Sequence, residues 1–91
     1  MTIKRRGKLE VIADILRSIQ DKDGKIKPTH LLYRSNLSHA KLKEYINILL
    51  EKGMIEEMIV KSKKMFFIKD QGYKFLSEFE RIKDFSDSSG L

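Results

Sequence analysis

Few side chains in this 91-residue chain could do covalent or metal chemistry. The chain has no cysteine, which excludes a disulfide framework, a thiolate nucleophile and a zinc site built on sulfur. Its two histidines, His30 and His39, have no Asp or Glu at metal-ligand spacing around them. The sequence also contains no Gly-rich phosphate loop, no GxSxG elbow and no HExxH pair. We therefore expect no enzyme, no cofactor and no metal site.

Positive charge is the remaining chemical feature, and it is unevenly distributed. The formal net charge is +6, yet residues 1–70 hold sixteen Lys or Arg against nine Asp or Glu, and residues 71–91 hold three against four. This asymmetry indicates a polyanionic partner. Nucleic acid is favoured over a membrane surface because no long basic amphipathic helix is visible. The alternative is a basic surface that only keeps the protein soluble.

The length and composition indicate what holds these charges. The chain is long enough for one domain, and its 41% hydrophobic and 35% charged residues are typical of a folded domain. A domain of this size buries only about 60% of its unfolded surface, so a dimer would add stability. The sequence shows no run of about 18 apolar residues and no signal-peptide h-region. We expect a soluble, cytoplasmic and nucleoid-associated protein.

Apolar periodicity predicts two helices in the first third of the chain. Apolar residues recur at three- and four-residue steps over residues 8–21, which indicates an amphipathic helix. The polar segment 21–25 contains a glycine and has the composition of a loop. Pro28 suits the first turn of a short helix over residues 28–35, because its missing N–H has no helical partner there.

A tight turn and a third helix follow. Asn36 tolerates the left-handed conformation that ends a helix, and Ser38 is a good N-cap for the next one. The third helix is predicted over residues 39–52, with Gly53 as its stop. About three residues then separate two helices, which is the length of the turn in a helix-turn-helix.

The pattern changes after this helix to two β-prone runs, residues 54–60 and 65–69. The basic segment 61–64 lies between them, so we predict a β-hairpin with a basic tip. Asp70 can cap a fourth helix over residues 71–84. The expected organisation is a flexible basic arm, a folded domain, a C-terminal dimerisation helix and a disordered tail, over residues 1–7, 8–70, 71–85 and 86–91.

This order of elements is that of a winged helix-turn-helix, an α+β, mostly α fold with three helices and a β-hairpin wing, here with an added C-terminal helix. The segments KLEVIADIL, YRSNLSHAKLKEYINILLEKGMIE and IKDQGYKFLSEFERI resemble the small archaeal winged helix-turn-helix DNA-binding proteins and transcriptional regulators. The resemblance covers about residues 7–84 and includes the NLS turn and Gly72. It implies sequence-preferring binding to double-stranded DNA, as a transcription regulator or small chromatin protein, and dimerisation through the last helix.

We expect the third helix to read base edges. Such a helix enters the major groove with its N-terminal half. Asn47 could pair with adenine, Glu44 could accept from cytosine and Lys43 could reach guanine or a phosphate. The alternative is a merely solvated helix face. The candidates for base reading are Ser38, His39, Ala40, Lys41, Lys43, Glu44 and Asn47.

Further basic or polar residues are expected to hold phosphates, which positions a protein on DNA without specifying sequence. Lysines on a hairpin can instead protect a sheet edge from aggregation, and a basic arm can be a solubilising tail. The candidates are Lys61, Lys63 and Lys64 on the wing, Tyr33 and Arg34 at the end of the second helix, and Lys4, Arg5, Arg6 and Lys8 in the arm.

The fourth helix is predicted to form a homodimer. Its apolar residues span roughly half the helix circumference, wider than the stripe of about 100° that packing on one surface requires. These residues are Phe75, Leu76, Phe79, Ile82 and Phe85. Two other functions stay open: a winged helix can be a protein-interaction module of a multisubunit assembly, and it can bind RNA.

Overall fold

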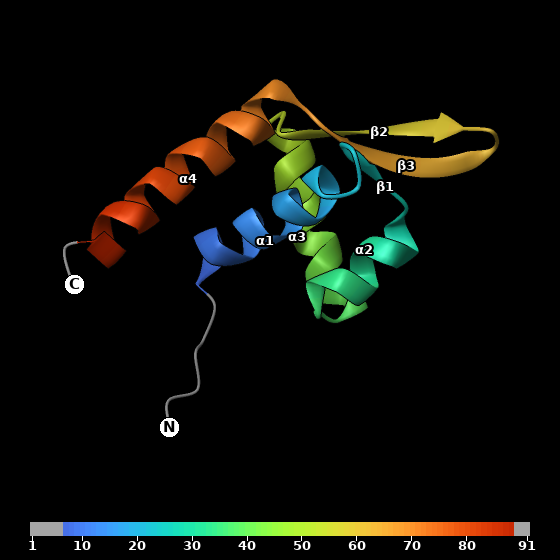
Figure 1. Ribbon diagram of the computed structural model, residues 1–91. Coiled ribbons are helices and arrows are strands. Elements are labelled where there is room, and N and C mark those ends of the chain that lie inside the picture. Colours follow the sequence, from blue (N-terminus) through green and yellow to red (C-terminus); the bar gives the residue numbers. More distant parts are fainter. Residues whose placement is uncertain (1–6, 89–91) are drawn as a thin grey trace.

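A computed structural model describes residues 7–88 of the chain. Within this range the helices and the hairpin follow one another in the predicted order, with one additional short strand (Figure 1). The fold class predicted from the sequence is therefore confirmed. The elements are α1 (Lys8–Gln20), β1 (Lys25–Ile26), α2 (Pro28–Ser35), α3 (His39–Glu51), β2 (Ile55–Val60), β3 (Lys63–Ile68) and α4 (Asp70–Ser88).

The core is organised around α1, which contacts α2, α4 and the sheet. Its apolar stripe is fully enclosed at several positions, and burying one Leu or Ile side chain contributes about 1.5–3 kcal/mol to stability. Gly7 is the N-cap residue of α1, and its N–H donates to the Glu10 carboxylate at 3.1 Å. The α1 residues without exposed surface are Ala13, Ile15, Leu16 and Ile19.

The turn between α2 and α3 has the predicted geometry. Asn36 ends α2 with φ +59°, in the left-handed region. The Ser38 hydroxyl oxygen accepts a hydrogen bond from the Lys41 N–H at 3.1 Å and so caps α3. Ser35 fastens the turn from inside, because its hydroxyl donates to the Leu32 carbonyl at 3.1 Å and accepts from the Leu37 N–H at 3.3 Å. These bonds fix the direction in which α3 leaves the turn.

The end of α3 matches its sequence prediction as well. Gly53 has φ +71°, and its N–H donates to the Leu50 carbonyl at 3.1 Å. The Met54 N–H donates to the Leu49 carbonyl at 2.9 Å. This pair of bonds is the Schellman arrangement, in which a glycine after the helix satisfies the last carbonyls. It turns the chain directly into β2.

The hairpin is tighter than predicted. β2 and β3 pair antiparallel along their whole lengths, so only Lys61 and Ser62 form the turn. Their φ angles are +52° and +66°, the combination that a two-residue type I′ turn requires. The prediction of a four-residue basic link over 61–64 was wrong, since β3 already begins at Lys63. Cross-strand pairing extends the strand into lysines that have little β-propensity of their own.

Strand β1 was not predicted. Lys25 and Ile26 pair with Phe67 and Phe66 of β3, which makes β3 the central strand in the order β1-β3-β2. Two residues are too few to show the alternation of a strand, so segment 21–25 was interpreted as a loop throughout. Ile26 is buried in the core, and its position there depends on pairing with a distant part of the chain.

Helix α4 is longer than predicted. Asp70 is its first residue rather than its cap, and the helix continues to Ser88. An acidic residue is favourable in the first turn, where the helix dipole is positive. Residues 86–88, which the sequence assigned to a disordered tail, are therefore helical.

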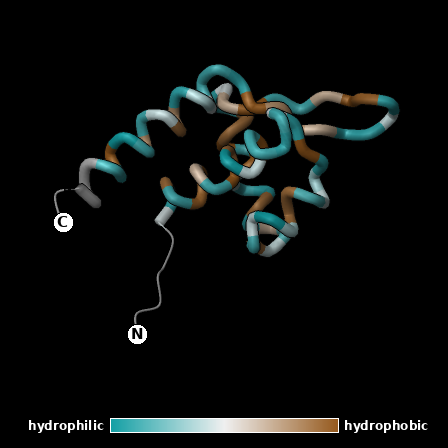
Figure 2. The backbone as a smooth tube through the Cα atoms, viewed as in Figure 1, coloured by the Kyte–Doolittle hydropathy of each residue, from teal (hydrophilic) through white to brown (hydrophobic). Residues whose placement is uncertain are grey.

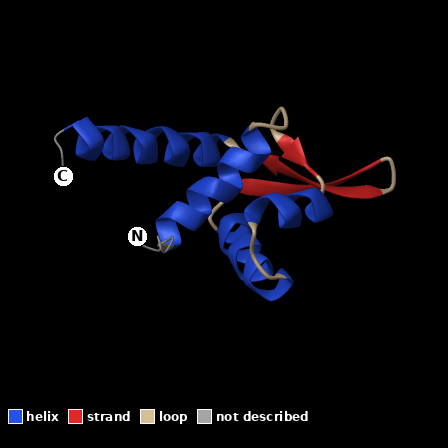
Figure 3. Ribbon diagram, turned by 60° about the horizontal axis from the view of Figure 1, so that its bottom comes forward, coloured by secondary structure: helices blue, strands red, loops and turns tan. Residues whose placement is uncertain are grey.

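The wing and α4 extend from opposite ends of the helical body. Both Figure 1 and Figure 3 show the β2–β3 hairpin projecting on one side and most of α4 projecting on the other. Figure 2 shows hydrophobic segments inside the body, and a further one near the end of β2, on the projecting wing. The helical body thus separates the wing, expected to contact DNA, from α4, expected to form the dimer.

Candidate nucleic-acid interface

The polar residues of α3 lie on two sides of the helix. His39, Lys43 and Asn47 follow at four-residue steps and line one wall of a cleft that opens toward the wing. Lys41 and Glu44 lie further round the helix and form an ion pair of 3.6 Å between Lys41 Nζ and Glu44 Oε1. Both of these side chains are exposed, so the pair contributes little to stability.

The wing lysines also point in different directions. Side chains alternate along a strand, so Lys64 shares the face of the buried Phe66, which is the face covered by the helices. Its Nζ lies 3.7 Å from Glu57 Oε2 on β2. Lys63 is on the opposite face, and Lys61 is at the tip. All three lysines are exposed.

The cleft between α3 and the wing brings polar residues of the helix close to a lysine of the wing. It has a volume of about 340 Å³ and is lined by α2, α3 and the sheet. Lys43 stands on the α3 side and Lys64 on the β3 side. A cation on each side is the arrangement expected of a surface that follows a phosphate backbone.

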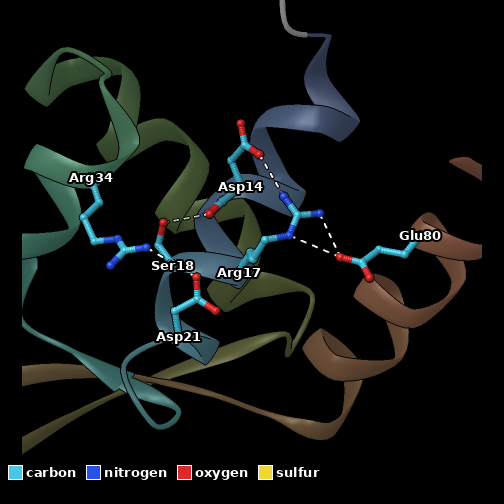
Figure 4. A network of polar contacts seen from close by, with 6 residues as sticks. All are labelled: Asp14, Arg17, Ser18, Asp21, Arg34 and Glu80. Atoms are coloured by element: carbon cyan, nitrogen blue, oxygen red, sulfur yellow. Dashed lines mark hydrogen bonds and ion pairs between the residues drawn. The ribbon is translucent and has the colours of Figure 1, made fainter.

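The two candidate residues at the end of α2, Tyr33 and Arg34, are exposed, but Arg34 already has an ion-pair partner. Tyr33 is 83% exposed, so its side chain is not part of the core. The Arg34 guanidinium forms an ion pair of 3.4 Å with the Asp21 carboxylate (Figure 4). This pair is half exposed and therefore weak, so Arg34 can exchange it for a phosphate. Arg5 and Arg6 of the arm lie outside the described residues, and Lys8 is the exposed first residue of α1.

The predicted dimer face on α4 is partly used by the chain itself. Leu76 is only 4% exposed and belongs to the core, so its assignment to the dimer interface is corrected. Phe75 and Phe79 stack with ring centroids 5.9 Å apart and are partly buried against the core. Ile82 is 66% exposed. The side chain of Phe85 lies outside the described residues.

An ion pair between Arg17 and Glu80 joins α1 to α4, beside further polar contacts within α1 (Figure 4). The Arg17 guanidinium donates to Glu80 Oε2 through Nε at 3.2 Å and Nη2 at 3.0 Å, and to Asp14 Oδ1 through Nη1 at 3.2 Å. The neighbouring Ser18 hydroxyl donates to the Asp14 carbonyl at 2.9 Å. Of these bonds, only the two from Arg17 to Glu80 join the helices, and because both side chains are partly exposed, this pair adds little to the packing of α4.

Residues 7–88 contain no group of three His, Asp or Glu that could hold a metal ion. No helix in this range is long and apolar enough to cross a membrane.

Sequence reasoning missed the apolar side chains on the wing and the carboxylate in the cleft. Ile59 is 67% exposed, and Met58 and Val60 are each 41% exposed. The sequence alone indicates only that these residues belong to a β-prone run. Glu57 lines the cleft opposite α3. The register of the hairpin would have identified these positions, but it follows from the two-residue turn, which the sequence did not reveal.

A helix-turn-helix followed by a two-stranded wing defines the winged-helix class of domain. The family model described as winged helix-turn-helix matches residues 5–87, and the chain belongs to that family. A search of curated protein sequences finds no match.

Solved structures share this fold at low sequence identity. Sso10a-2, a DNA-binding protein from Sulfolobus solfataricus, is 23% identical with a TM-score of 0.73, and the match covers 93% of this chain and 90% of that one. F93 from STIV, a winged-helix DNA-binding protein, is 17% identical with a TM-score of 0.70, covering 77% and 83%. BpsR of Bordetella bronchiseptica is 13% identical with a TM-score of 0.74, covering 87% and 58%.

Proposed function

We propose that this protein binds double-stranded DNA with a sequence preference, as a transcription regulator or small chromatin protein. The observation that carries the proposal is the pair of lysines on the two sides of the cleft, Lys43 on α3 and Lys64 on the wing. With α3 in the major groove, the wing reaches the flanking backbone. Two of the structurally similar proteins, Sso10a-2 and F93, are DNA-binding proteins, which supports this assignment.

Base reading in this proposal falls to the exposed residues of α3. The side chains of His39, Lys43 and Asn47 have no hydrogen bond or ion pair with any described residue, so DNA can engage them without breaking an internal contact. Glu44 is already paired with Lys41. Lys61, Lys63, Lys64, Tyr33 and Arg34 supply phosphate contacts, as do Arg5 and Arg6 of the arm.

The experiment compares four ligands at matched salt by fluorescence anisotropy: duplex DNA, each of its single strands, and double-stranded RNA of the same sequence. Duplex DNA should bind most tightly. Lys43→Gln together with Lys64→Gln should weaken that binding, because two phosphate or base contacts are lost. Lys74→Gln together with Lys83→Gln removes the same charge from α4 and serves as the control. An equal loss of affinity for duplex DNA in both double variants would contradict the proposal, and so would tighter binding of the RNA duplex than of the DNA duplex.

The proposed functional unit is a homodimer joined through α4. Ile82 on α4 and Leu9 on α1 are both exposed, and α4 projects from the body where a second copy can reach it (Figure 3). A two-fold pair of domains would place two α3 helices on one duplex, as dimeric helix-turn-helix proteins do.

A protein-interaction module is the second candidate. The outer face of the wing carries Met58 and Val60, which are exposed apolar residues typical of a protein contact. The lysines of α3 and of the wing favour DNA over this alternative. Failure of all four nucleic-acid ligands to bind would leave the interaction module as the better assignment.

A further inference from the structure

The cleft between α3 and the wing has the properties of a small-molecule site. Its volume of about 340 Å³ lies at the lower end of the range for such sites, which is about 300–1,000 Å³. Apolar side chains from three elements line it: Leu32 of α2, Leu42, Ile46 and Leu50 of α3, and Phe66 of β3. An apolar lining with a few convergent polar groups is the usual composition of a ligand site.

The polar lining of the cleft has an excess of positive charge. Lys43 and Lys64 are its two lysines, and Glu57 is its one carboxylate. Glu57 is already paired with Lys64 at 3.7 Å. The Lys43 side chain forms no ion pair with any described residue. The side chains of the neighbouring His39 and Asn47 form no hydrogen bond with any described residue. The cleft therefore offers one uncompensated cation beside an apolar surface.

We propose that this cleft binds a small organic acid with an apolar body and one carboxylate. The apolar body would rest against Leu32, Leu50 and Phe66, and the carboxylate would accept a charge-assisted hydrogen bond from Lys43. Asn47, one helical turn further on, can donate a second. A neutral ligand would cover the Lys43 ammonium without replacing its lost hydration, which is unfavourable. A cationic ligand would be repelled by that ammonium.

Occupation of the cleft would compete with DNA. His39, Lys43, Asn47 and Lys64 line the cleft and are also proposed DNA contacts, so the acid and the duplex cannot use these side chains together. This competition rests on the proposed DNA function, whereas binding of the acid does not. By linkage, each ligand lowers the apparent affinity of the other.

The test is an NMR titration of the full chain, labelled with ¹⁵N, in the absence of DNA. Benzoate and hexanoate are the probes for a ring and for a chain, and benzamide is the neutral match for benzoate. At least one acid should give saturable shifts confined to the amides of α3, the start of α2 and β3. Each acid that saturates is compared with its neutral amide, benzamide for benzoate and hexanamide for hexanoate. The amide should bind at least tenfold more weakly than its acid.

Two variants of α3 separate the cleft from the general basic surface. Lys43→Gln should weaken binding of the acid by about tenfold or more, as expected for loss of a charge-assisted hydrogen bond. Lys41→Gln removes the same charge on the side of the helix that does not line the cleft, and should change binding less than twofold. Equal effects of the two variants, shifts spread over all exposed lysines, or no saturation by either acid would overturn the proposal.

A separate measurement tests the competition. At an acid concentration ten times its own Kd, the apparent Kd for duplex DNA should rise by about tenfold. An unchanged Kd for DNA with a saturated cleft would overturn the competition and leave the ligand site standing. Absence of any DNA binding would contradict the proposed function, and the titration without DNA would still decide the acid site.

Discussion

Asn47 is the residue of α3 with the clearest single role in base recognition. Its side chain is exposed, makes no hydrogen bond with a described residue and lies one turn from Lys43. We expect Asn47→Ala to relax discrimination at one base position by about 1–3 kcal/mol, because an amide that pairs with adenine is lost. Thermal stability should stay unchanged. Selection from random duplexes, followed by affinity measurements on single-base variants, checks this.

Glu51→Ala is the matched control for Asn47→Ala. Glu51 is exposed on the same helix but lies at its C-terminal end, away from the half that enters the groove. It should leave the ranking of sites as it is. An unaltered ranking with Asn47→Ala would mean that another face of α3 reads the bases, or that none does.

Gly72 is required for the contact between α4 and the start of the hairpin. A Cβ at this position would lie 2.5 Å from the Met54 carbonyl oxygen and 2.7 Å from Ile68 Cγ1. The Met54 carbonyl cannot retreat freely, because it accepts a hydrogen bond from the Lys69 N–H at 2.9 Å. Gly72→Ala should therefore lower the free energy of unfolding by about 1–3 kcal/mol, the usual cost of overpacking.

Chemical denaturation measures this change in stability. Ser77→Ala on the exposed side of α4 is the control, and it should change the free energy of unfolding by less than about 0.5 kcal/mol. A Gly72→Ala protein as stable as the parent would show that α4 can move away from Met54 without loss.

The wing is the element expected to supply affinity without specificity. Each phosphate contact on duplex DNA contributes roughly 0.9 to the slope of log K against log salt. Converting Lys61, Lys63 and Lys64 to Ala should flatten that slope by about two to three units. The preferred site should remain the same, because a lysine on a phosphate carries no base identity.

Binding isotherms at several salt concentrations, on preferred and scrambled duplexes, measure the slope. The control converts Lys22, Lys74 and Lys83 to Ala, which removes the same charge from exposed positions outside the wing and α3. Its slope should change much less. An unaltered slope in the wing variant would assign those lysines to protection of the hairpin edge.

The whole molecule is expected to be a dimer in solution. Sedimentation equilibrium at micromolar concentration should give about twice the chain mass of 10.7 kDa. Ile82→Asp should shift the protein to the monomer, because a charge would be buried at the contact between two copies. Ile82 is the better choice than Phe79, which also packs against the core of its own chain. A monomeric parent, or a dimer indifferent to Ile82→Asp, would contradict the dimer.

Ser77→Asp introduces the same charge on α4 without touching the apolar side. Ser77 is exposed and lies about 140° around the helix from Ile82, at 100° per residue. This variant should remain dimeric. DNA affinity of the two variants, measured together, then tells whether dimerisation strengthens binding.

Local features of the sequence determined most of the fold. The ends of α2 and α3 were predictable because Pro28, Asn36, Ser38 and Gly53 each act on the backbone within a few residues. The amphipathic period of α1 likewise identified its buried side. These signals need no knowledge of the rest of the chain, and they were sufficient for the order of the helices and the hairpin and for the winged-helix class.

Features that depend on contacts between distant segments required the tertiary structure. β1 exists because Lys25 and Ile26 meet β3 about forty residues later, and no pattern of two residues announces such a pairing. Leu76 looked like its apolar neighbours on α4, but the position of α4 against the core buries it.

The candidate site was likewise predictable in part from the sequence, and the rest required the tertiary structure. The sequence identified Lys43, Asn47 and Lys64 by type and by expected element, since exposed polar residues on a helix and a hairpin are visible in the pattern. Only the packed structure showed that they line one cleft together with Glu57 and an apolar floor. The reason is physical: periodicity specifies which side of an element is polar, whereas the distance between two elements is set by packing and strand register.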